Sequence, residues 1–164
     1  MKIAVLSDTH LNTPTPWFGE VYARYLAPAD AVLHCGDIAG YAMLEYLEGL
    51  PNFYGVSGNM DEMRIHDELP PTRIVELEGF RIGMTHGAGA WGDAASVVAS
   101  WFPPGLDMIC FGHTHVYEWR IIDGVRVLNP GSAGLPRKGE PSLALVTAQQ
   151  GLPLMVEKVV LERG

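Results

Sequence analysis

Three short apolar runs alternate with helical segments at the start of the sequence, and this alternation restricts the fold more than any other feature. Residues 2–7, 31–34 and 53–56 form the apolar runs, which are typical of strands buried on both faces. Residues 17–26 and 41–50 carry apolar side chains at the spacing of a helix face. The order strand, helix, strand, helix, strand predicts a parallel sheet covered by helices.

Antiparallel strands are expected in much of the remaining sequence. Residues 62–72 are polar and contain prolines, which predicts a loop or a short helix. We expect a helix over residues 93–101, with Asp93 as its N-cap, and a strand over residues 107–111. Three strand pairs joined through glycine-containing turns are predicted at 73–77 with 81–85, 117–122 with 125–128, and 142–147 with 154–161. We therefore expect one α/β domain over residues 1–164, with two packed sheets and helices outside.

Charge and composition restrict the partners and the compartment. The net charge of -8 gives no support to a broad nucleic-acid-binding surface. No apolar stretch approaches the roughly 20 residues of a membrane span, and the first apolar run is shorter than the about 7–15 residues of a signal-peptide core. We therefore expect a cytoplasmic protein without membrane contact. In that compartment Cys35 and Cys110 are expected to be buried free thiols.

Polar side chains follow five of the expected strands at the point where each strand ends. In chain order they are Asp8 and His10, then Asp37, Asn59 and His86, and finally the pair His113 and His115. Ligands of open α/β sheets bind beyond the carboxyl ends of the strands, so we expect these side chains to meet there. His113 and His115 lie two residues apart, and on an extended backbone they would point to the same side.

The seven side chains have the chemistry of a metal centre. Two aspartates, one asparagine and four histidines are more ligands than one cation uses, which predicts two cations that share a bridging ligand. Asp37 is the expected bridge, since a carboxylate has two oxygens. Oxygen and imidazole ligands without a thiolate favour Mn, Fe, Zn or Co over Ca or Mg. Two cations about 3.5–4 Å apart are a recurrent device for displacement at phosphorus.

Simpler structural roles are expected for other residues of the same types. We expect His34 to be a hydrogen-bonded core residue and His66 to be solvated. Arg137 and Lys138 form a basic pair that has two interpretations, a solvated loop, which we favour, and a contact with a substrate phosphate. Core packing rather than a pocket lining is expected for the tryptophans Trp17, Trp91 and Trp101.

The strand-end motifs resemble those of a known family. Asp8-Thr9-His10, Gly36-Asp37, Gly58-Asn59, His86-Gly87 and Gly112-His113-Thr114-His115 are similar to the five motifs of the calcineurin-like metallophosphoesterases. The short length and the expected turn Asn129-Pro130-Gly131-Ser132 resemble the small bacterial and archaeal phosphodiesterase branch. The resemblance implies a four-layer αββα sandwich of two mixed β-sheets flanked by helices, and a homo-oligomer, either a dimer or a tetramer.

The resemblance also implies a binuclear centre and an activity. One ion would be held by Asp8, His10, Asp37 and His115, and the other by Asp37, Asn59, His86 and His113. Mn²⁺ is the favoured ion, with Fe, Zn, Co or Ni as alternatives. A hydroxide that bridges the metals would attack phosphorus in a small phosphate-ester substrate, foremost a phosphodiester.

Two departures from the family pattern bear on the chemistry. Many members have a histidine that can protonate the leaving oxygen where this sequence has Met60, so we expect a preference for good leaving groups. Asp61 is an alternative proton donor, as is a metal-bound water, although we favour a role for Asp61 in orienting a ligand. Ala88 replaces a further histidine of many members.

Two other functions stay open on the same fold. A phosphomonoesterase or nucleotidase would use the same centre, although Met60 argues against it. A non-catalytic protein-interaction scaffold is the second alternative, because the retromer coat contains a metallophosphoesterase-like subunit whose corresponding stretch resembles residues 90–96. A scaffold does not need all seven ligands, so the intact set favours an enzyme.

Overall fold

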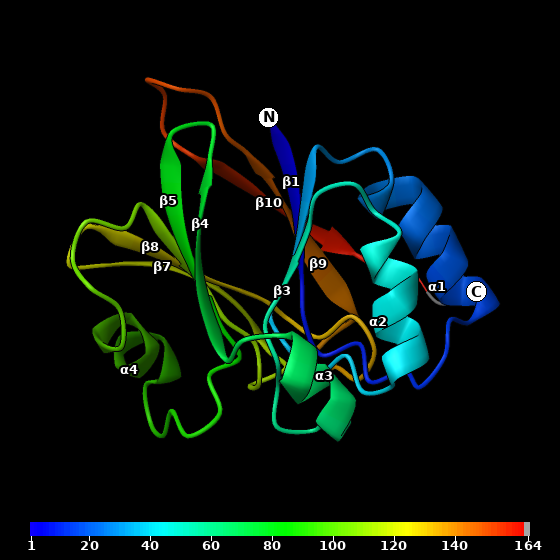
Figure 1. Ribbon diagram of the computed structural model, residues 1–164. Helices are drawn as coiled ribbons and strands as arrows, with labels where there is room; N and C mark the ends of the chain where they lie inside the picture. Colours follow the sequence, from blue (N-terminus) through cyan, green and yellow to red (C-terminus); the bar gives the residue numbers. More distant parts are fainter. Residues whose placement is uncertain (163–164) are drawn as a thin grey trace.

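Two five-stranded sheets lie at the centre of the computed structural model, which describes residues 1–162 (Figure 1). The first sheet contains, in spatial order, β10 (Met155–Val160), β9 (Ser142–Thr147), β1 (Lys2–Leu6), β2 (Ala31–His34) and β3 (Phe53–Gly55). The second contains β4 (Thr72–Leu77), β5 (Phe80–Thr85), β6 (Met108–Cys110), β8 (Val125–Pro130) and β7 (Tyr117–Ile122). Both sheets are mixed, because β1–β2–β3 and β5–β6–β8 are parallel whereas the other neighbours are antiparallel.

Helices cover the outer face of each sheet. Figure 1 shows α1 (Pro16–Val21), α2 (Tyr41–Glu48) and α3 (Met63–Glu68) on the side of the first sheet. The helix α4 (Ala94–Ser100) packs on β7 and β8 of the second sheet. The four-layer αββα sandwich and the three antiparallel strand pairs expected from the sequence are therefore confirmed.

Three apolar clusters hold the four layers together. One lies between the sheets and includes Val5, Ile82 and Cys110, another lies between the first sheet and its helices, and the third lies under α4. Successive β1 side chains enter different clusters, since Val5 faces the second sheet whereas Leu6 packs beneath the helices. Burial on both faces is the reason that this strand has no polar alternation. Both cysteines are buried and free, as expected.

The helix predicted over residues 17–26 is divided in two. The α1 segment begins at Pro16, where the Thr15 hydroxyl caps the N–H of Phe18, and a π-helix labelled η1 (Tyr22–Leu26) continues it. The N–H of Ala27 donates to the carbonyl of Tyr22 at 2.8 Å, which is the wider spacing of a π-helix. Side-chain periodicity over ten residues does not distinguish these two helix types.

Other predicted elements differ in extent or exposure. Residues 62–72 contain the short helix α3, one of the two alternatives. The strand β8 continues to Pro130, so half of the predicted turn at 129–132 is strand. Proline is tolerated there because the pairing of β8 with β6 already ends at Leu128.

The expectation of core packing is wrong for Trp91, which is 85% exposed, and for Trp101, which is 44% exposed. None of the helices within residues 1–162 has the length and apolar character of a membrane span.

The inter-sheet core provides a prediction on stability. Replacing Ile82, which is fully buried in β5, by alanine should lower the free energy of unfolding by about 2–5 kcal/mol, because a cavity opens between the sheets. Ile121→Ala in β7 is the matched control, since this side chain is 68% exposed, and should cost less than about 1 kcal/mol. Urea denaturation measures both variants, and equal losses would contradict the assigned core.

Candidate metal centre

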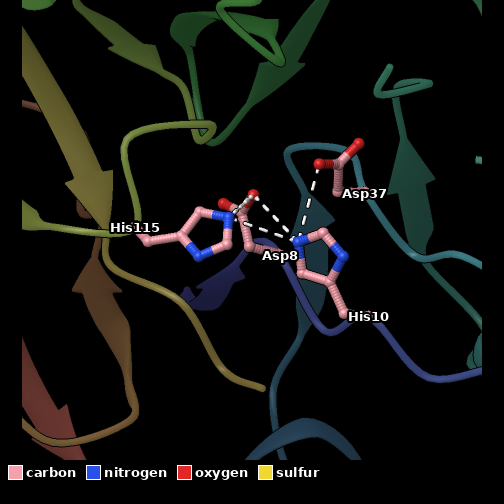
Figure 2. A group of neighbouring side chains, drawn as sticks. All are labelled: Asp8, His10, Asp37 and His115. Carbon is pink, nitrogen blue, oxygen red and sulfur yellow. Dashed lines mark hydrogen bonds and ion pairs between the residues drawn. The ribbon is translucent and has the colours of Figure 1, made fainter. Parts of the chain in front are cut away.

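Loops after four strands bring polar side chains together at the end of the sheets opposite to the N-terminus (Figure 1). One group consists of Asp8 and His10 after β1, Asp37 after β2 and His115 after β6, and its ligand atoms all lie within 4.8 Å of one another. Figure 2 shows the carboxylate of Asp8 between the rings of His10 and His115. The sequence predicted this set, although its members lie more than a hundred residues apart.

The Nε2 atoms of two histidines point into this group. They lie 3.2 Å from each other, and His115 Nε2 is 3.1 Å from Oδ1 of Asp8. His10 Nε2 is 3.6 Å from Oδ2 of Asp37. On the other side of its ring, His115 donates from Nδ1 to the carbonyl of Leu135 at 2.5 Å, which leaves the Nε2 lone pair available for a cation.

A third histidine, His86, lies beside Asp37, and His113 lies beside His86. Oδ2 of Asp37 is 3.2 Å from His86 Nε2, and the ring centroids of His86 and His113 are 5.1 Å apart. His86 donates from Nδ1 to the carbonyl of Cys35 at 2.8 Å, so its Nε2 is again the free ligand atom. Asp37 therefore lies between a group containing His10 and a group containing His86, which is the position required of a bridging carboxylate.

Six of the seven predicted residues take part in these contacts, and Asn59 is the seventh. Asn59 is exposed in the loop after β3, and its side chain forms no hydrogen bond within residues 1–162. Its neighbour Met60 donates its N–H to Oδ1 of Asp37 at 2.8 Å, so the loop itself contacts the centre. The role of Asn59 as a ligand stays a prediction.

A left-handed backbone is concentrated at the candidate ligands. Eight described non-glycine residues have a positive φ, and five of them are candidate ligands, Asp8 (55°), His10 (49°), Asp37 (54°), His113 (68°) and His115 (59°). This conformation costs energy outside glycine and is found most often at functional sites. The prediction of an extended backbone at His113 and His115 is wrong, and the two rings have different neighbours, since His113 lies beside His86 and His115 beside His10.

Two buried polar atoms in the site form no hydrogen bond. They are Oδ1 of Asp8, which is 3.1 Å from His115 Nε2, and Nε2 of His86, which is 3.2 Å from Oδ2 of Asp37. Leaving a buried acceptor without a partner is costly, and such atoms are rare in folded proteins. A divalent cation would satisfy both lone pairs, so the donor set fits a metal.

The carboxylates and imidazoles shift one another's pKa values. Burial alone would raise the pKa of Asp8, but its contacts with His10 and His115 outweigh burial and hold the pKa well below its usual range. Contact with Asp8 raises the pKa of His115. Burial would lower the pKa of His86, but the contact with Asp37 outweighs it and raises the pKa. Without a metal, His86 and His115 therefore bind a proton more tightly than a free histidine does.

Asp61 orients the loops that carry the centre. Its Oδ1 accepts the N–H of Ala39 at 2.8 Å, and its Oδ2 accepts the N–H of Gly58 at 2.7 Å. Burial raises the pKa of Asp61, and these two hydrogen bonds oppose that rise. Because both oxygens are occupied by the backbone next to Asp37 and Asn59, the geometry favours the positioning role over proton donation.

Close packing against the loop that carries Asp8 explains why residue 112 is a glycine. Two further side chains bond to the backbone of the ligand loops, which the sequence did not predict. A Cβ at Gly112 would lie 1.9 Å from Oγ of Ser7 and 2.7 Å from Oδ2 of Asp8, so a larger residue has no space. The side chain of Asn129 donates to the carbonyl of Gly112 at 2.8 Å, and Ser132 Oγ donates to the carbonyl of Asp8 at 2.8 Å. From the sequence, Asn129 and Ser132 were expected only to form a turn.

The residues expected outside the centre do lie outside it. His34 is fully buried, and its Nε2 lies 3.2 Å from the hydroxyl of Thr9. Burial lowers the pKa of His34 to about 3, so this ring is neutral. His66 is exposed on α3, so the expectations for both histidines are confirmed. Arg137 and Lys138 are exposed in a loop, which is compatible with both interpretations of the basic pair.

Comparisons with known proteins identify the family. Residues 1–151 match the calcineurin-like phosphoesterase superfamily domain. A probable metallophosphoesterase of Methanothermobacter thermautotrophicus is 33% identical over 147 residues, which cover 89% of this chain and 85% of that protein.

Solved structures of the same fold agree with this match. The structure of an archaeal phosphodiesterase superposes with a TM-score of 0.76 at 25% identity, over 98% of this chain and 100% of that chain. Vps29 of Entamoeba histolytica in complex with Zn²⁺ superposes with a TM-score of 0.71 at 25% identity, over 99% of this chain and 100% of that chain. Motifs, fold and similarity thus lead to the same result, and this chain belongs to the calcineurin-like phosphoesterase superfamily.

Proposed function

We propose that this protein is a phosphodiesterase that depends on two divalent metal ions. The observation that carries the proposal is the position of Asp37, whose Oδ2 lies 3.6 Å from His10 Nε2 on one side and 3.2 Å from His86 Nε2 on the other. One shared carboxylate between two imidazole groups is the arrangement that a binuclear centre needs. The phosphodiesterase structure with the same fold supports the choice of a diester substrate.

Each ion has a set of side chains that suits it. Asp8, His10, Asp37 and His115 would hold one ion, while Asp37, Asn59, His86 and His113 would hold the other. Bound ions would supply an activated water and would stabilise negative charge on the phosphoryl oxygens. The N–H groups and carbonyls that bond to Asp37, His86 and His115 fix each ligand in one orientation before a substrate arrives.

Manganese is the ion that we propose for the centre. The donors are carboxylate, amide and imidazole without a thiolate, which suits Mn²⁺ as well as Fe, Co, Ni and Zn²⁺. Zinc is the ion in the structure of the Entamoeba Vps29. Metal-stripped protein that is reloaded with each ion separately will rank them.

A protein-interaction scaffold is the second candidate. It is favoured by the similarity to Vps29 and by Trp91, which is 85% exposed on the loop that follows His86. The two candidates differ in turnover, because a scaffold that binds metal would hydrolyse no ester.

The bridging role of Asp37 is testable by an isosteric change. Asp37→Asn keeps the size and removes the charge, so we expect bound metal to fall from two ions to one or none per chain. We also expect at least about 10³-fold slower hydrolysis of bis(p-nitrophenyl) phosphate with Mn²⁺. Asp67→Asn, on the exposed face of α3, is the control and should keep metal and activity. Unchanged metal content and turnover in Asp37→Asn would refute the proposal, and a wild-type protein inactive with every metal would favour the scaffold.

Metal uptake should depend on pH through the histidines. The raised pKa values of His86 and His115 mean that protons compete with the metal at low pH, so Mn²⁺ affinity should rise between about pH 5 and 8. In the metal-free protein, the raised pKa values contribute stability that is lost as pH rises through them, so Mn²⁺ should raise Tm more at about pH 8 than at about pH 6. Calorimetry in two buffers measures the protons released. His66→Gln should leave this dependence unchanged, and a flat profile in the wild type would contradict the assignment.

Restoring a proton donor at Met60 should change the preference for leaving groups. Met60 is 61% exposed beside Asn59, so a histidine there has space, and Met60→His should accelerate hydrolysis of alkyl esters by about 10–100-fold. Aryl esters with good leaving groups should gain much less. Met63→His is the control, because Met63 is 77% exposed on α3. Equal gains on both ester types, or a wild-type enzyme that already cleaves alkyl esters as fast as aryl diesters, would count against the prediction.

A further inference from the structure

The segment before the basic pair is attached to the loop that carries Asp8. The N–H of Gly134 donates to the carbonyl of Asp8 at 3.1 Å, and the Ser132 hydroxyl donates to the same carbonyl at 2.8 Å. The Ser132 hydroxyl also accepts the N–H of Leu135 at 2.7 Å. The exposed loop at residues 137–140 therefore follows a segment that is hydrogen-bonded to the candidate metal centre.

A second set of contacts attaches this loop to His115. The carbonyl of Leu135 accepts from Nδ1 of His115 at 2.5 Å, and the N–H of Arg137 donates to the carbonyl of His115 at 3.4 Å. The backbone of Arg137 is thus one hydrogen bond away from a candidate metal ligand. An arginine side chain that starts there is long enough to reach a group bound on the metals.

The guanidinium of Arg137 is available for a ligand. It is exposed, and it forms no hydrogen bond or ion pair with any residue from 1 to 162. Two other arginines are already engaged, since Arg120 pairs with Asp93 and Glu118 and Arg64 pairs with Glu68.

The charge of Arg137 also reaches the centre. Burial lowers the pKa of His113 and contact with Asp8 raises the pKa of His115, and in both rings the charge of Arg137 is a smaller contribution that lowers the pKa. In a chain with a net charge of -8, such a cation beside the metals alters the local field in favour of an anion.

We propose that Arg137 binds a non-bridging oxygen of the phosphate ester that the centre hydrolyses. The proposal rests on the proposed function and deepens it, since it assigns a protein cation to the substrate. Guanidinium binds phosphate through two parallel N–H donors and carries its charge at every physiological pH. The backbone of Arg137 bonds to that of His115, so its side chain starts beside the metal site and can bind an oxygen of an ester held there. Lys138 lacks these contacts with the centre and is not assigned to the substrate.

Phosphate binding to the manganese-loaded protein tests this assignment without turnover. Arg137→Met should weaken the affinity for inorganic phosphate, measured by calorimetry, by about tenfold to a hundredfold, which corresponds to the loss of one charged hydrogen-bonding partner. Lys138→Met is the matched control, because it removes the same charge from the next residue, and should change the affinity by less than about twofold. Arg137→Lys should recover part of the loss. Bound manganese, measured in all variants, should not change.

Steady-state kinetics separates substrate binding from a structural effect. For bis(p-nitrophenyl) phosphate, Arg137→Met should raise KM by a factor similar to the loss of phosphate affinity, while kcat changes less. Unchanged phosphate affinity in Arg137→Met, or an equal loss in Lys138→Met, would overturn the assignment, as would a loaded wild-type protein that binds no phosphate. If the wild type binds phosphate through Arg137 but hydrolyses no ester with any metal, the proposed function fails and the assignment stands.

Discussion

Two buried carboxylates, those of Asp8 and Asp37, lie at one end of the sandwich, and the rest of the site follows from the need to neutralise them. An isolated charge in such surroundings is very costly. Three histidines lie beside these carboxylates, and their nitrogens are 3.1–3.7 Å from the carboxylate oxygens. They are His10, His86 and His115. These contacts leave lone pairs unsatisfied, which a divalent cation would complete.

The scaffold stabilises a site that is locally strained. Five candidate ligands have a left-handed backbone, and each such residue costs of order 1–3 kcal/mol when it is not glycine. Three apolar clusters between the four layers supply the compensating stability at a distance from the ligands. The loops are also bonded to one another, because Asp61 joins the backbone at Ala39 to that at Gly58. Rigid loops of this kind hold ligands in place before metal or substrate arrives.

Features of the fold that depend on a local pattern of side chains were predictable from the sequence. Strands buried on both faces have continuous apolar runs, so β1, β2 and β6 and the polar residues after them could be located. Features that depend on contacts between distant segments were not predictable. The exposure of Trp91 is one example, and the bond between His115 and Leu135 is another, since twenty residues separate the two. Nor does a pattern of side chains report the φ angles that turn His113 and His115 toward different neighbours.

Metal binding alone does not separate an enzyme from a scaffold, because a Vps29 of this fold also carries Zn²⁺. Burial of Asp8 and Asp37 would favour a cation in either protein, since the ion relieves the same electrostatic cost. Arg137 is different, because it is not needed to hold an ion and lies outside the apolar clusters. An exposed cation fixed beside a metal centre gains a partner only when an anion binds there. The proposed role of Arg137 therefore concerns a ligand with negative charge, which is the property that phosphate esters share.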